Sequence, residues 1–139
     1  MEKVVIESKL CSLADLLQKM KDILKAHDQN KVLQEYLLYG AEKKAEEIVE
    51  LAISINQELL KSKGIIGRSY YESFLDLGKL GLFSEEERLW FAGTAGFRNR
   101  LAHEYLEVDL TVALRIMQKM GVMYPKYLQV IKKYVSGKK

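Results

Sequence analysis

Apolar side chains recur every three or four residues along most of this chain, the spacing that places them on one face of an α-helix. The 139 residues include one proline and nine glycines, so long segments run without a helix breaker. The spacing predicts long helices at about 3–26 and 31–60, a short helix at about 70–79, and two further long helices that follow Ser84 and Asp109. We therefore expect an all-α fold, an up-and-down bundle of four long helices and one short helix.

Length and composition are typical of an ordinary globular protein. The hydrophobic residues make up 48% of the chain and the charged residues 29%, which is far from the composition of a disordered segment. A chain of this length can enclose one sizeable hydrophobic core. We expect a single helical domain over residues 1–139.

Local signals mark the start of the last two long helices. Ser84 followed by Glu87 forms the pattern of a capping box, and Asp109 is a good N-cap residue. Pro125 should kink or interrupt the last helix near residues 121–124. These two helices also carry more large apolar side chains than one core needs, which favours a homodimer interface there. The side chains in question are Trp90, Phe91, Met117, Met120, Met123, Tyr124 and Tyr127.

Composition excludes several kinds of site. A net charge of +3 is too small to indicate a nucleic-acid partner by itself, so any such partner must be argued from a local motif. Cys11, the one cysteine, permits neither an intrachain disulfide nor a thiolate metal cluster, and we expect it to be buried on the first helix. The chain shows neither a signal-peptide pattern at its start nor an apolar run approaching the roughly 20 residues of a membrane span. We expect a cytoplasmic protein that does not associate with membranes.

The residue types best suited to phosphate chemistry lie together in the sequence GFRNRLAHEY, residues 96–105. The Arg98 guanidinium can hold a phosphate by a fork of donors, and His103 can transfer a proton near neutral pH. On a straight helix these two side chains point about 140° apart. Convergence on one phosphate therefore requires a bend, a helix end or a second subunit. From the spacing alone, surface ion pairs and residues that cap the bundle are the simpler interpretation.

A family resemblance favours the functional interpretation. Arg98-Asn99-x-x-x-His103-x-Tyr105, preceded by Gly96-Phe97 and followed by Asp109, resembles the signature of the HEPN superfamily. Within that superfamily the pattern is most similar to the HepT-like toxins, which pair with a minimal nucleotidyltransferase antitoxin. The resemblance extends from about residue 48 to residue 109, roughly half of the chain.

The resemblance implies a metal-independent endoribonuclease that works as a homodimer without a cofactor. The 2′-hydroxyl of RNA would attack the adjacent phosphate, and Arg98 would stabilise the charge that develops on the phosphoryl oxygens. His103 would act as general base or general acid, and Asn99 would orient the phosphate or the histidine. The resemblance also implies that the partner nucleotidyltransferase adenylates Tyr105 and so silences the toxin.

Further residues are candidates for supporting roles. Arg100 and Arg68 are candidate RNA contacts, with a simply solvated side chain as the alternative for Arg100. Relatives often place an acidic residue on the second helix, facing the motif. The nearest position here is Ser54, and Glu50 or Glu58 could replace that acid, depending on the register of the helix.

A second function remains open at this point. The chain could be a non-catalytic helical module that docks a nucleotidyltransferase and helps to bind nucleotide. The intact motif favours the nuclease, whereas a missing acid at the position of Ser54 would favour the module.

Overall fold

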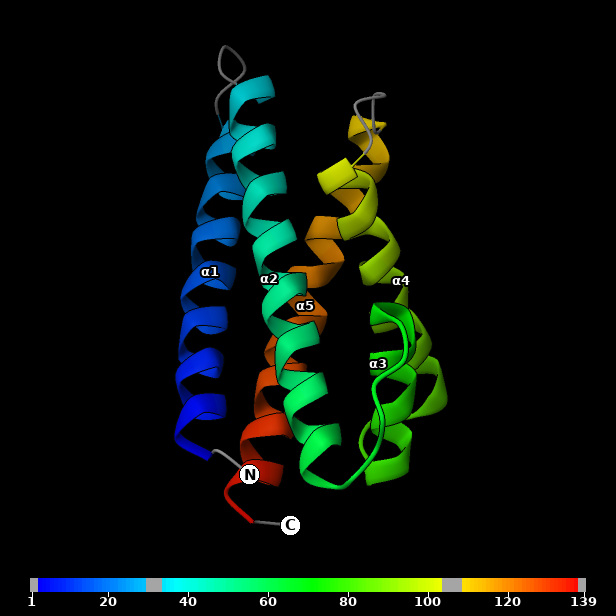
Figure 1. Ribbon diagram of the computed structural model, residues 1–139. Helices are drawn as coiled ribbons and strands as arrows, with labels where there is room; N and C mark the ends of the chain where they lie inside the picture. The colour runs from blue at the N-terminus through cyan, green and yellow to red at the C-terminus, as the bar shows by residue number, and fades with distance from the viewer. Residues whose placement is uncertain (1–2, 30–33, 104–108, 138–139) are drawn as a thin grey trace.

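The computed structural model describes residues 3–29, 34–103 and 109–137 (Figure 1), with the backbone alone described at residues 29, 34, 35 and 103. These residues form helices joined by loops, without a strand, which confirms the expected all-α class. The elements are α1 (Lys3–Gln29), α2 (Gln34–Ser62), α3 (Tyr70–Leu75), the 3-10 helix η1 (Asp76–Leu80), α4 (Glu85–His103) and α5 (Leu110–Val135).

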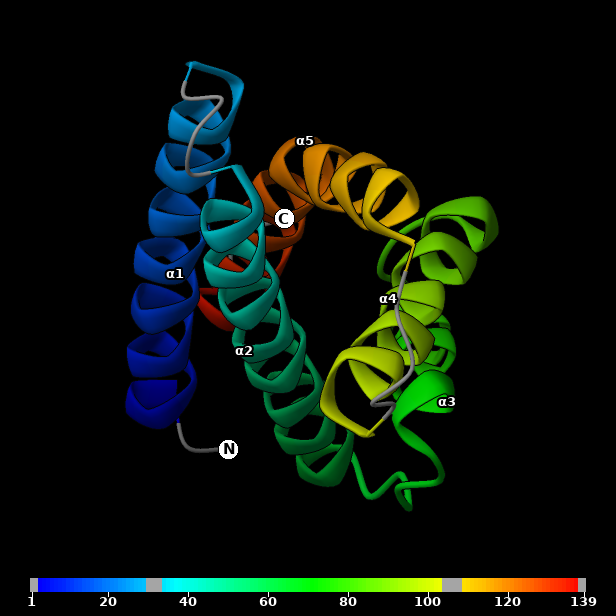
Figure 2. The same ribbon diagram turned by 90° about the horizontal axis from the view of Figure 1, so that it is seen from above.

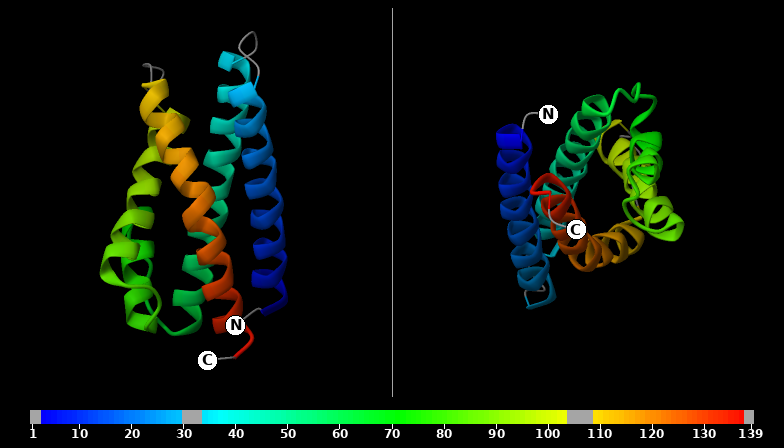
Figure 3. Two further views of the ribbon diagram at one scale, coloured as in Figure 1. Left: turned by 180° about the vertical axis from the view of Figure 1, so that it is seen from behind. Right: turned by 90° about the horizontal axis from the view of Figure 1, so that it is seen from below.

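The four long helices run up and down along one bundle. Helices α1 and α2 lie side by side on one flank, and α3 and α4 pack together on the other (Figures 1 and 2). Helix α5 crosses behind them and packs against both α1 and α2, as the view from behind shows (Figure 3). Since α2 contacts α3 and α4 as well as α1, it joins the two flanks.

Both predicted caps are present. The Ser84 hydroxyl accepts a hydrogen bond from the Glu87 amide (3.1 Å), and the Glu87 carboxylate accepts one from the Ser84 amide (2.9 Å). Asp109 Oδ1 accepts from the amides of Thr111 (2.9 Å) and Val112 (3.2 Å). These bonds satisfy amides that a helix start leaves unpaired, which explains why α4 and α5 begin where the sequence indicates.

Of the two outcomes expected at Pro125, a kink or an interruption of the helix, the interruption is wrong. Helix α5 continues from Leu110 to Val135 with Pro125 inside it. A proline within a helix removes one backbone hydrogen bond and costs about 3 kcal/mol. Tyr124 and Tyr127, which flank it, are fully buried, and burial of this apolar face offsets that cost.

The expectation that α4 and α5 carry more large apolar side chains than one core needs is also wrong. Five of the seven residues behind it are fully buried within the chain itself, namely Phe91, Met117, Met120, Tyr124 and Tyr127, while Trp90 and Met123 are half-buried against the core. The aromatic rings pack on one another, with Phe91 centred 5.2 Å from Tyr124 and 5.6 Å from Tyr127. The core of one chain therefore uses these side chains, and they give no support to a dimer interface.

The expectation that Cys11 is buried is wrong. Cys11 is exposed, although its neighbours Leu10 and Leu13 are buried. One residue along a helix turns the side chain by about 100°, so Cys11 falls outside the stripe that Leu10 and Leu13 define.

No helix in the described ranges is long and apolar enough to cross a membrane.

Two buried tyrosines tie the helices together by hydrogen bonds. The Tyr127 hydroxyl lies 2.6 Å from Asn56 Oδ1 on α2. The Tyr124 hydroxyl lies 2.8 Å from Thr94 Oγ1 on α4. Burial raises the pKa of both phenols above their ordinary value, so both stay protonated at any pH at which the protein is studied.

Removing one of these hydroxyls should lower stability without changing the fold. We expect Tyr127→Phe to reduce the free energy of unfolding by about 1–3 kcal/mol, because it leaves a buried Asn56 oxygen without its donor. Urea denaturation measures the change, and Tyr134→Phe, a half-buried tyrosine on the same helix, is the control. Equal midpoints for the two variants would contradict this account of the core.

Candidate functional site

Arg98 lies on α4 and reaches across to α2. Its Nε (3.2 Å) and Nη2 (2.9 Å) both donate to Glu50 Oε1, and its Nη1 donates to Asn99 Oδ1 (3.1 Å). The side chain is only 16% exposed. A guanidinium has five N–H groups, so two remain without a partner among the described residues. Arg98 is thus held in one orientation while it keeps donors for a ligand.

Glu50 is the acidic residue that faces the motif. The sequence left Ser54, Glu50 and Glu58 as alternatives, and the structure pairs Glu50 with Arg98. Ser54 lies one turn further along the same face of α2. Its hydroxyl accepts a hydrogen bond from Lys9 Nζ on α1 (2.6 Å). The absence of an acid at Ser54 therefore leaves the site with a carboxylate on the neighbouring turn.

A hollow of about 300 Å³ lies beside this ion pair. It is lined by Glu50, Ile53, Ser54, Gln57, Tyr70 and Arg98. The three elements that form it are α2, the start of α3, and α4. Of these residues, sequence reasoning missed Tyr70 and Gln57. The signal for Tyr70 was its place directly after the cap residue Ser69, where the chain leaves the glycine-containing loop.

Tyr70 contacts the arginine through its ring. The guanidinium carbon of Arg98 lies 5.8 Å from the ring centroid, a distance at which a cation is attracted to an aromatic face. Tyr70 is nevertheless 46% exposed. The ring therefore supports Arg98 on one side and remains accessible from the hollow.

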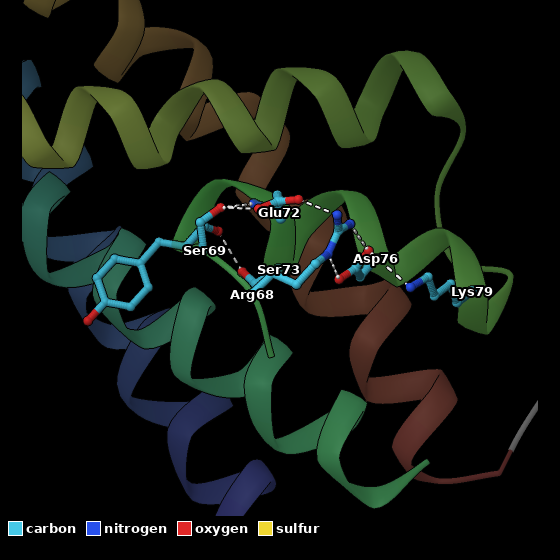
Figure 4. Close-up of polar contacts among 7 residues, drawn as sticks. Arg68, Ser69, Glu72, Ser73, Asp76 and Lys79 are labelled. Atoms are coloured by element: carbon cyan, nitrogen blue, oxygen red, sulfur yellow. Dashed lines mark hydrogen bonds and ion pairs between the residues drawn. The ribbon is translucent and has the colours of Figure 1, made fainter. Parts of the chain in front are cut away.

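Arg68, a candidate RNA contact from the sequence, is engaged in a local network of ion pairs (Figure 4). Its Nη2 (2.5 Å) and Nε (3.2 Å) donate to the two carboxylate oxygens of Asp76, and its Nη1 pairs with Glu72. Asp76 is almost completely buried, and its hydrogen bonds with Arg68 hold the pKa of its carboxyl below the ordinary value. This network fixes the loop before α3 to the 3-10 helix after it.

The remaining predicted residues are placed as follows. Asn99 lies next to Arg98 and bonds to it, and Arg100 is exposed on α4. Helix α4 continues without a break through Gly93 and Gly96 and ends at His103. The side chain of His103 and the whole of Tyr105 lie outside the described residues. The structure thus brings Arg98, Asn99 and Glu50 together and places Arg68 in a separate network.

Within the described residues, the side chains that usually bind metal ions are spread apart. No group of three or more histidine, cysteine or acidic side chains there is arranged so that it could hold an ion.

Comparisons with known proteins agree with the motif and the fold. The family model described as Ribonuclease HepT-like matches residues 13–133. The tRNA nuclease HepT of Aphanizomenon flos-aquae (strain 2012/KM1/D3) is 33% identical over 141 residues, which cover 96% of this chain and 92% of that protein.

A solved structure has the same fold. It is a rebuilt and re-refined structure of a tri-AMPylated Shewanella oneidensis HEPN toxin in complex with MNT antitoxin. It matches with a TM-score of 0.74 at 19% identity, over 92% of this chain and 96% of that chain. Since the family model covers most of the chain and a curated relative is similar over nearly all of it, the protein belongs to the HepT-like ribonuclease family.

Proposed function

We propose that the protein is a metal-independent endoribonuclease toxin that acts in the cytoplasm and is neutralised by a partner nucleotidyltransferase. The observation that carries this proposal is the Arg98 fork, held by Glu50 and Asn99 at the edge of an open hollow. A cation fixed in this way can stabilise charge on a phosphate without reorganising during the reaction. The whole chain would act as one helical domain.

The proposed reaction is an internal transfer within RNA. The 2′-oxygen forms a bond to the adjacent phosphorus while the bond from phosphorus to the 5′-oxygen breaks. The proton of the 2′-hydroxyl passes to a general base, and a general acid delivers a proton to the leaving 5′-oxygen. The products are a 2′,3′-cyclic phosphate and a 5′-hydroxyl. The reaction as written requires neither a metal ion nor a cofactor.

Each motif residue has a distinct proposed role. Arg98 stabilises the phosphoryl oxygens through its N–H groups that remain available, and Glu50 holds its fork in place. His103 serves as general base or general acid. Asn99 orients the Arg98 guanidinium through the bond to Nη1. Arg100, exposed on the same helix, is a proposed contact to the RNA backbone.

The relatives support a nuclease and a partner of defined chemistry. A relative that is 33% identical is a tRNA nuclease, so tRNA is the first substrate to test. The structural neighbour is a tri-AMPylated HEPN toxin in complex with MNT antitoxin. We propose the same kind of partner here, with transfer of adenylate to Tyr105. Phosphates added there would compete for Arg98 and repel RNA.

The nuclease activity predicts a specific pattern of variants. We expect the wild-type protein to cut tRNA in the presence of a chelator and to leave ends with a cyclic phosphate. Arg98→Ala should lower the rate by about 10²–10³-fold and His103→Ala by about 10²–10⁴-fold. Gel analysis of end-labelled tRNA measures both rates.

Matched controls separate the motif from general effects of charge. Arg115→Ala, on an exposed position of α5, should keep the wild-type rate. A 2′-deoxy substitution at the cleavage site should block cutting, because the attacking hydroxyl is removed. Intact RNA at high concentrations of wild-type protein would instead favour the non-catalytic module, and activity that returns only with added metal ion would contradict metal independence.

Adenylation predicts one modified residue. When the toxin is mixed with its partner nucleotidyltransferase and ATP, the wild-type protein should gain adenylate groups and lose nuclease activity. Tyr105→Phe should gain none, because it lacks the accepting oxygen, while Tyr71→Phe should behave as the wild type. Intact-mass spectrometry and peptide mapping measure the result, and label on another residue with Tyr105 unmodified would refute the assignment.

The homodimer is proposed because Arg98 and His103 are five residues apart on one unbroken helix. A twofold axis would allow the arginine of one subunit to meet the histidine of the other. Mixing inactive Arg98→Ala with inactive His103→Ala should then restore part of the activity. Light scattering gives the mass, and a fully active monomer would overturn the dimer.

A further inference from the structure

A second hollow adjoins the one beside Arg98. It has a volume of about 410 Å³ and is lined by Gln57, Lys61 and residues 64–67. Gln57 lines both hollows, so they lie next to each other along α2, and we refer to the two together as the groove. Between Glu50 and Lys61 the helix advances about 16 Å. The groove therefore extends well beyond the space that a single phosphate needs.

The groove combines an aromatic ring, aliphatic side chains, amide and hydroxyl groups, and cations. Tyr70 is accessible from the hollow, and the Gln57 amide can both donate and accept hydrogen bonds. Lys9 donates to Ser54, which leaves the Ser54 hydroxyl proton available to a ligand. Arg98 and Lys61 supply positive charge among the lining residues, against the one carboxylate of Glu50. This is the chemistry that binds unpaired nucleotides, whose bases stack on aromatic rings and whose phosphates seek cations.

The backbone segment that carries Tyr70 is braced by the two residues before it. Ser69, the residue before it, caps α3 by accepting from the Glu72 amide (3.1 Å). Arg68 ties the same segment to the buried Asp76, as Figure 4 shows. An aromatic ring on such a braced segment loses little conformational entropy when a base stacks on it.

We propose that this groove binds a single-stranded segment of the RNA substrate, with Tyr70 as the stacking platform for the base next to the cleaved phosphate. Gln57 contacts the edge of a base, and Lys61 binds a phosphate further along the strand. The proposal deepens the nuclease function and rests on it. It makes Tyr70 a residue that selects unpaired RNA over a duplex, whose bases are stacked on one another and cannot reach the ring.

The first test uses neighbouring tyrosines of nearly equal exposure. Tyr70 is 46% exposed and Tyr71 is 43% exposed, but only Tyr70 lines the hollows described above. The probe is a single-stranded 2′-O-methyl RNA, which the enzyme cannot cleave. Fluorescence anisotropy should show about 5- to 150-fold weaker binding for Tyr70→Ala. Tyr71→Ala should bind as the wild type does, because Tyr71 lines neither hollow. Tyr70→Phe should also bind as the wild type does, because it keeps the aromatic ring.

The second test uses neighbouring lysines. Lys61 lines the second hollow, and Lys63 lines neither of these two. For single strands each phosphate contact contributes about 0.7 to the slope of log affinity against log salt. Lys61→Ala should reduce the slope by about that amount, and Lys63→Ala should leave it unchanged. Equal slopes for the two variants would show that Lys61, and with it the second hollow, does not bind an RNA phosphate.

The outcomes also separate this proposal from the proposed function. If the wild type cuts tRNA while Tyr70→Ala binds the probe as tightly as Tyr71→Ala, the nuclease stands and the groove assignment fails. If the wild type binds the probe through Tyr70 but cuts no RNA, the groove stands and the nuclease fails. Unchanged RNA affinity of Tyr70→Ala together with lost binding of the nucleotidyltransferase would assign the groove to the protein partner and overturn the proposal.

Discussion

The site depends on how α5 spaces α2 and α4. Tyr127 on α5 bonds to Asn56 of α2, and Tyr124, one turn earlier, bonds to Thr94 of α4. Both phenols are fully buried. Because a buried polar group needs its partner, these bonds fix the spacing of the two helices as well as their contact. That spacing lets the Arg98 side chain on α4 reach the Glu50 carboxylate on α2.

The electrostatics of the site are local rather than global. A net charge of +3 gives the chain little general attraction for RNA. Glu50 cancels part of the Arg98 charge, so this pair attracts a phosphate less than a lone arginine would. The Glu50 carboxylate instead fixes the orientation of the guanidinium, since it accepts hydrogen bonds from Nε and Nη2 and leaves a defined set of N–H donors. Under the proposed function, affinity for RNA would then come from further contacts beside this pair.

The sequence predicted the helices well because their signals are short-range. Apolar spacing of three and four residues located every long helix, and the side chains of Ser84 and Asp109 marked where α4 and α5 begin. Pro125 does not end α5 because the free-energy cost of the proline is smaller than the stabilisation from packing the helix face that carries it. The inference of a surplus of apolar side chains was wrong because the number of aromatic side chains that a core holds depends on how closely its helices approach. No local sequence pattern records that distance.

The candidate site was predictable only where its residues are close in the sequence. The motif on α4 could be identified directly, whereas its partners come from elsewhere in the chain. Arg98 and Glu50 are 48 positions apart, and the choice among Ser54, Glu50 and Glu58 depends on the rotation of α2 about its axis. Tyr70 reaches the arginine from the start of α3, directly after the segment that the Arg68 network ties to the 3-10 helix. These contacts are properties of the tertiary arrangement.

The hydrogen bond from Lys9 to Ser54 has a consequence for comparing members of this family. Lys9 precedes residue 13, where the match to the family model begins. The ammonium group that bonds to Ser54, a lining residue of the hollow, therefore comes from a part of the chain outside the matched residues. Relatives that share the motif but differ before the matched residues can for this reason present differently charged entrances to the hollow, and a fragment cut to residues 13–133 would lack this ammonium group.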